Sequence, residues 1–180
     1  AIQDYGRGLV VGSQTFGKGT VQAVRPLNHG QLKITQSKFY RVSGGSTQHK
    51  GVIPDIEIPS RIDKTRIGED ALDHALPWDQ IEAVPHTRYF DFSGIIDELR
   101  KRHEERFSTN PEFSLLQQEI DFLTKQRATD SVSLNLEERR AEHEQIERTR
   151  LTIANARREL KGQTPFESLE DLEDWQDQQA

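Results

Sequence analysis

The sequence contains neither cysteine nor methionine in its 180 residues. Without cysteine there is no disulfide bond, no thiolate nucleophile and no cysteine-ligated zinc, although the compartment stays open. The lack of methionine, with Ala1 in the first position, predicts that the chain is a piece of a longer protein. Long apolar runs are also missing. Because a membrane span needs roughly 18 apolar residues, we expect no transmembrane segment.

Apolar residues are scarce and charged residues abundant, at 33% and 30% of the chain. This composition is polar for a compact globule, so we expect part of the chain to form thin, solvated helices. Basic residues outnumber acidic ones up to about residue 60, and acidic residues predominate afterwards. No segment combines dense lysine and arginine with exposed aromatic residues, so the sequence predicts no nucleic-acid partner.

The pattern of residues 1–60 is typical of β structure. Residues 9–11 form a short apolar run that predicts a buried strand, and residues 20–24 alternate as a strand does. Residues 28–30 carry an Asn-His-Gly turn signal before a second extended stretch. Residues 52–59 alternate again, but their two prolines confine them to an edge strand or an extended tail.

Beyond residue 60 the pattern becomes polar and then helical. We expect a linker and packing segment over residues 61–92 and a helical extension over residues 93–180, which makes the fold class α+β or α/β. Asn110 followed by Pro111 is typical of a helix start. The apolar stripe of that helix would consist of Phe113, Leu116, Ile120 and Leu123.

Two further helices are predicted nearer the end of the chain. Asn135 with Glu138 three residues later resembles a capping box, and it opens a charged stretch that runs to about residue 160. The apolar seam of this stretch is only about two heptads long, too short for an independent coiled coil. Leu169, Leu172 and Trp175 indicate a short final helix.

A phosphate-binding loop is an alternative reading of residues 12–18, which place Gly12 and Lys18 after an apolar strand. Such a loop needs serine or threonine directly after the lysine to ligate magnesium, and this chain has Gly19 there. It also needs a helix next, whose amide groups face the phosphates. The residues that follow alternate as a strand, so we disfavour a phosphate-binding domain.

Lys18 is the candidate catalytic residue, with Gln22 as its positioning partner. Lys18 lies between two glycines, which permit close approach of another backbone segment. Gln22 follows four residues later, so both side chains would face the same side of a strand. A lysine serves as general base only when neutral, and a glutamine orients it without adding a negative charge. Taken alone, this spacing is common in solvent-exposed strands.

The surrounding segments resemble the C-terminal processing peptidases, in particular the bacterial tail-specific proteases. Residues 5–12 (YGRGLVVG) and 15–22 (TFGKGTVQ) resemble the segment around the family's catalytic lysine. The later segments that resemble the same branch are KFYRV at 38–42, GGSTQ at 44–48, KGVIPD at 50–55, ALPWD at 75–79, NPEF at 110–113 and VSLN at 132–135. The resemblance covers residues 1 to about 145.

The resemblance implies part of a serine endopeptidase with a Ser/Lys dyad, in which Lys18 is the base and Gln22 orients it. The serine, the oxyanion-hole donors and a peptide-binding PDZ module would precede residue 1, so we expect these residues alone to be inactive. Ser13 would face away from Lys18. The substrates would be proteins or peptides with free C-termini, the compartment would be the periplasm, beside the inner membrane, and no cofactor is implied.

A second hypothesis treats the chain as a structural module that docks an adaptor or a second copy. The six histidines form no H-E-x-x-H pattern or other close pair, so no metal site is predicted. Asp55, which follows a proline, is expected to be a turn or strand-edge residue. Trp78 is expected to bury its ring against the β region.

Overall fold

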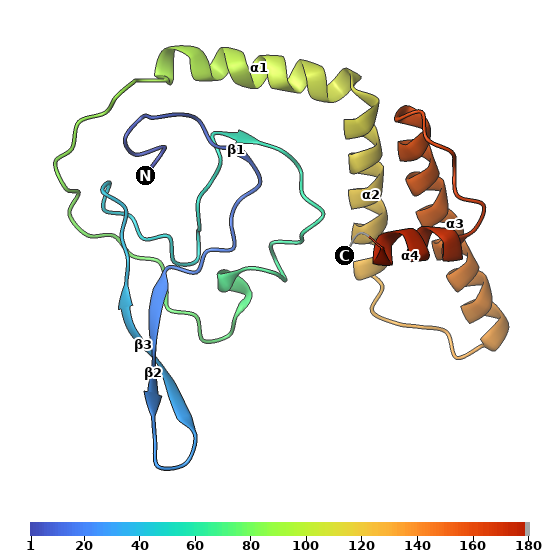
Figure 1. Ribbon diagram of the computed structural model, residues 1–180, viewed down its shortest axis with the longest axis horizontal. Coiled ribbons are helices and arrows are strands. Elements are labelled where there is room, and N and C mark those ends of the chain that lie inside the picture. Colours follow the sequence, from blue (N-terminus) through green and yellow to red (C-terminus); the bar gives the residue numbers. More distant parts are fainter. Residues whose placement is uncertain (179–180) are drawn as a thin grey trace. The chain divides into compact units, whose positions relative to one another are not determined.

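The computed structural model describes residues 1–178, which form two compact units that divide between residues 103 and 104 (Figure 1). Among the described residues, all four strands lie in the first unit, and three of the four α-helices lie wholly beyond it. The fourth, α1 (Ser93–Thr109), contains the division between the units. The predicted mixture of a β-rich piece and a helical extension is confirmed.

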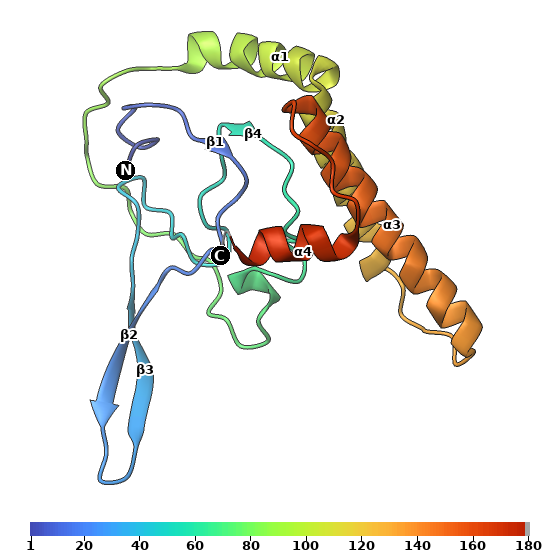
Figure 2. The same cartoon turned by 45° about the vertical axis from the view of Figure 1, so that its right-hand side comes forward.

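The most regular part of the first unit is a two-stranded antiparallel hairpin. It pairs β2 (Thr20–Pro26) with β3 (Gln31–Lys38), and a bulge interrupts the register between Val21 and Gln22. The predicted turn closes it, with Leu27 N donating to Gly30 O at 3.1 Å. In Figures 1 and 2 the hairpin projects from the loops of its unit, and every residue of β3 except its last is exposed.

The prediction of a buried strand at residues 9–11 is wrong. Only β1 (Val11–Gly12) forms there, and it pairs in parallel with the equally short β4 (Ile56–Glu57). Val11 is 54% exposed because the pair has two strands and no further layer covers it. Asp55 has the expected structural role, since its Oδ2 accepts from Val10 N at 2.8 Å.

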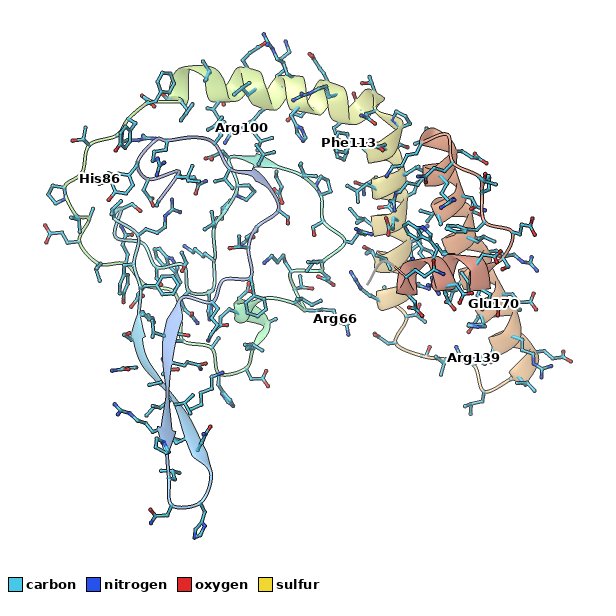
Figure 3. All side chains as sticks on the ribbon, in the orientation of Figure 1. Arg66, His86, Arg100, Phe113, Arg139 and Glu170 are labelled. Atoms are coloured by element: carbon cyan, nitrogen blue, oxygen red, sulfur yellow. The ribbon has the colours of Figure 1, made fainter. Side chains whose placement is uncertain are left out.

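A charged pair ties the first residues to the loop after β3. Asp4, whose side chain is 3% exposed, accepts from Arg41 Nε at 2.8 Å and pairs with Arg41 Nη2 at 2.6 Å. Burial raises the pKa of Asp4, but the hydrogen bonds and charge of Arg41 outweigh it, so the pKa is lowered overall. His86, which Figure 3 labels, also contacts Asp4, with its Nε2 3.2 Å from Asp4 O.

The segment after β4 contains the 3₁₀ turn η1 (Glu69–Ala71) and then runs to α1 without regular structure. Trp78 is half-buried as expected: its Nε1 donates to Ser46 O at 2.9 Å, and Lys50 Nζ lies 3.5 Å from its ring centroid. Arg100, labelled in Figure 3, connects the first part of α1 to the residue before β4 in the same unit, by donating from Nε to Asp55 O at 3.0 Å.

The second unit packs α2 (Pro111–Arg127) against α3 (Leu136–Leu160), and α4 (Leu169–Asp177) against α3. The buried side chains are Leu115 of α2, Ile153 of α3 and Leu172 of α4. Leu115 was not part of the predicted stripe, whose members are only half-buried. The charged outer surfaces carry ion pairs such as Arg148–Glu144, as expected for thin helices.

Polar caps start these helices where the sequence predicts. Asn110 Oδ1 accepts from Glu112 N at 2.8 Å, and Asn135 Oδ1 accepts from Glu137 N at 2.9 Å. The predicted capping box is half formed. The bond from Asn135 N to the Glu138 side chain is missing, because Glu138 accepts from Ser133 Oγ and Asn135 N donates to that same hydroxyl. None of the helices in residues 1–178 is long and apolar enough to cross a membrane.

Candidate active site

The segment that carries Lys18 is held by close backbone contact. Gly17 has φ +95°, and a Cβ there would lie 2.4 Å from His49 O. A Cβ on Gly19 would lie 2.4 Å from Gln48 N. Atoms this close cannot be accommodated without a backbone shift, so both positions require glycine. The expectation that the glycines allow close approach of another segment is confirmed.

Lys18 and Gln22 line one pocket of about 430 Å³. Thr20 lies between them in sequence and lines the same pocket; within β2, Thr20 and Gln22 are two residues apart, the spacing at which strand side chains share a side. Thr35, which is opposite Gln22 in the hairpin register, belongs to it as well. The remaining wall comes from η1 and the residues after it: Glu69, Leu72, Asp73, His74, Ala75 and Leu76.

The amine of Lys18 is exposed and has one hydrogen-bond partner among the described residues, Thr20 Oγ1 at 2.9 Å. No serine lines the pocket. Ser13 instead lines a separate pocket with Phe16, which agrees with the expectation that Ser13 faces away from Lys18. The described residues therefore present a lysine, a glutamine and two threonines, with no nucleophilic serine beside them.

Two residues that the sequence did not predict form hydrogen bonds with the segment that carries Lys18. Gln48 is fully buried, and its Oε1 accepts from Gly19 N at 2.8 Å. Its Nε2 donates to Glu69 Oε1 at 2.9 Å, and Glu69 N donates to Phe16 O at 2.9 Å. The two glycines indicated a close neighbour, but nothing in the sequence indicated which residues it would contain.

The structure does not support the phosphate-loop alternative. Strand β2 begins at Thr20, so no helix N-terminus follows Lys18. Within residues 1–178, no group of three or more histidine, aspartate or glutamate side chains is arranged to hold a metal ion. The strand that follows Lys18 therefore leaves this lysine without the helix N-terminus that a phosphate-binding loop requires.

Comparison with known families defines the class of this chain in two parts. Residues 1–58, which include Lys18 and Gln22, match the model of peptidase family S41. Residues 62–180 match the model described as the C-terminal domain of tail specific protease. The chain belongs to the tail-specific protease branch of the C-terminal processing peptidases, as its motifs predicted.

Curated relatives carry matching descriptions. The tail-specific protease of Haemophilus influenzae is 39% identical over 184 residues, which cover 96% of this chain and 26% of that protein. The carboxy-terminal-processing protease of Bartonella bacilliformis is 39% identical over 71 residues, covering 39% of this chain and 16% of the relative. A probable CtpA-like serine protease of Staphylococcus epidermidis is 42% identical over 59 residues, or 32% and 12% of the two chains. The chain therefore spans about a quarter of the Haemophilus relative, or less of the others.

Proposed function

We propose that this chain is part of a serine endopeptidase that selects substrates by their C-terminal tail and cleaves them with a Ser/Lys dyad. Lys18 is the general base and Gln22 orients it. One observation carries this proposal: Lys18 and Gln22 line the same pocket, on a segment fixed by glycine contacts. The families matched on both sides of residue 60 support the assignment to a protease.

In this mechanism the serine Oγ attacks the peptide carbonyl carbon while its proton passes to Lys18 Nζ. The C–N bond then breaks, and the lysine ammonium returns the proton to the leaving amine. Water attacks the resulting ester and gives a proton to Lys18, which transfers it to the departing serine oxygen. The products are two shorter peptides and a regenerated serine hydroxyl, and no metal or cofactor takes part.

The serine, the oxyanion-hole donors and the PDZ module come from parts of the protein outside these 180 residues. Residues 1–60 are the C-terminal part of the catalytic core, residues 61–92 the linker and residues 93–180 the helical extension. The exposed amine of Lys18 requires the rest of the core to cover it, because a lysine acts as a base only when shielded enough to lose its proton. By itself the 180-residue chain is inactive.

The test uses the full-length protein and a peptide with a free apolar C-terminus. Lys18→Ala is expected to abolish cleavage while leaving the fold intact, and Lys18→Arg is expected to do the same because a guanidinium keeps its proton. Gln22→Ala is expected to lower kcat by about 10- to 100-fold. Lys33→Ala, on the opposite strand of the hairpin, is the matched control and keeps full activity. Cleavage by Lys18→Ala at the normal rate would refute the proposal.

The compartment proposed for the protein is the periplasm, beside the inner membrane.

An interaction role is a second candidate function of the helical unit, in which it docks an adaptor or a second copy. It is favoured by Val132, Leu134 and Leu136, which precede or open α3 and are 62%, 100% and 63% exposed. If this surface mediates self-association, Leu134→Ser lowers the mass measured by light scattering. An unchanged mass excludes self-association through Leu134.

A further inference from the structure

The most deeply buried side chain in the described part of the molecule is a polar one. Gln48 is 0% exposed, and Glu69, which accepts its hydrogen bond, is 6% exposed. Burial of polar groups is unfavourable unless each is bonded. Two such residues beside the lysine-bearing segment therefore need a reason beyond packing.

Their bonds converge on one short stretch of backbone. Gln48 Oε1 accepts from Gly19 N at 2.8 Å, and Glu69 N donates to Phe16 O at 2.9 Å. The two side chains are joined by the bond from Gln48 Nε2 to Glu69 Oε1 at 2.9 Å. Phe16 and Gly19, the residues on either side of the Gly17-Lys18 pair, are thereby connected through a single chain of hydrogen bonds. We name Gln48 and Glu69 the polar clamp.

Further hydrogen bonds hold the backbone of Gln48 and of Gly19 in place. Gln48 N donates to Ser46 Oγ at 3.0 Å, and Gly19 O accepts from Phe39 N at 3.1 Å. Both backbone groups of Gly19 are therefore bonded, and the buried residues around Gln48 leave little freedom for its side chain to turn. Lys18, whose own side chain is exposed, lies on a backbone that is fixed on both sides.

We infer that Gln48 and Glu69 are positioning residues for Lys18, which hold its backbone so that the amine reaches the nucleophile. This inference rests on the proposed function, because it assigns a role within the same reaction. Neither side chain needs to contact the substrate. Their effect is geometric, and a misplacement of about 1 Å in a catalytic group costs about 100-fold in rate.

The principal test is Gln48→Met in the full-length protein, which keeps the length of the side chain and removes both of its hydrogen bonds. We expect kcat to fall about 100-fold with KM changed less than about twofold, because the substrate is still bound while the base is misplaced. Gln14→Met is the matched control, since Gln14 also bonds across loops, to Lys50 O at 2.7 Å, but lines a different pocket. It should retain normal kcat.

Glu69 provides an independent pair of variants. Glu69→Gln keeps an oxygen that accepts from Gln48, whereas Glu69→Leu does not, so Glu69→Gln should be at least about 10-fold more active. This rescue separates positioning from simple loss of folding, because both variants remove the same buried charge. If Gln48→Met does not fold, the ratio of these two variants decides the question. Equal activity of the two would overturn the inference.

Hydrogen exchange tests the clamp without reference to catalysis. In Gln48→Met, the peptide covering residues 16–20 should lose protection while the peptide covering β3 stays protected. Loss of protection with an active Lys18→Ala enzyme would mean that the clamp exists and the proposed mechanism is wrong. Unchanged protection at residues 16–20, or normal kcat in Gln48→Met, would overturn the positioning role itself.

Discussion

The two units of this protein are stabilised in opposite ways. Within residues 1–178, all four buried polar or charged residues lie in the first unit, where Ile56 is the one buried hydrophobic residue. The helical unit has the reverse composition, because its buried side chains are three hydrophobic residues, one on each of α2, α3 and α4. One unit is held by directional bonds and the other by apolar contact.

This difference indicates what each unit is suited to do. Apolar burial is non-directional, so helices packed in this way can adjust to small changes without losing their fold. Hydrogen bonds between buried groups fix distance and angle together, and an unmade bond is costly. A lysine that must meet a partner at a defined distance is better placed by the second kind of contact.

The largest expected effect comes from adding a methyl group to the first unit. Gly19→Ala places a Cβ 2.4 Å from Gln48 N, so the backbone beside Lys18 must move. We expect peptide cleavage by the full-length protein to fall about 100-fold. Gly94→Ala is the control, because a Cβ at Gly94 meets nothing within 4 Å. If both variants cleave at the normal rate, the directional bonds of the first unit do not fix the position of Lys18.

In the helical unit, shortening a buried apolar side chain is expected to lower the stability most. Leu172 is 4% exposed, and Leu172→Ala should destabilise this unit by about 3 kcal/mol through loss of apolar contact and the cavity left behind. Urea unfolding followed by circular dichroism at 222 nm measures the loss. Leu134→Ala makes the same change at a leucine that is 100% exposed and should have almost no effect. A similar loss in both would show that burial is not what stabilises the helices.

A smaller effect, dependent on pH, is expected from Asp4. Its pKa is lowered in the folded state by Arg41, so it stabilises the fold above its unfolded pKa of about 3.9, and this contribution disappears as pH falls through the folded value. Asp4→Asn should therefore cost about 2 kcal/mol at pH 7. The cost should shrink toward pH 3 when unfolding midpoints are compared. A difference that is constant with pH would exclude the charge as its cause.

The smallest effect is expected at a helix start. Asn135→Ala removes the acceptor for Glu137 N and should cost about 1 kcal/mol, again measured by urea unfolding. Asn135→Ser should restore most of this, since a serine hydroxyl also caps helices. If serine gives no recovery, the contribution of Asn135 is not a cap, and the helical unit depends on apolar contact alone.

The helical unit was the more predictable of the two because its signals are local. Asn110 and Asn135 cap helices at the predicted positions, and the short final helix forms where Leu169, Leu172 and Trp175 predicted it. Leu115 was missed because the residue that becomes buried depends on where the neighbouring helix packs, which periodicity along one helix does not determine.

In the first unit, the four-residue spacing predicted that Lys18 and Gln22 lie together, and both line one pocket, although Lys18 precedes the strand. The glycines predicted a close neighbour. The polar clamp could not be predicted, because Gln48 and Glu69 are 21 residues apart and neither follows a periodic pattern. The buried strand at residues 9–11 failed for a related reason. An apolar run predicts burial only when another layer is present to cover it.

Lys18 and Gln22, four residues apart, line one pocket, and this spacing limits how the segment can change in evolution. Substitution of the side chains between the lysine and the glutamine leaves both on the wall of the same pocket. Insertion or deletion of a single residue there would turn the glutamine to the side of the strand opposite the lysine. The length of this stretch is therefore more constrained than its composition.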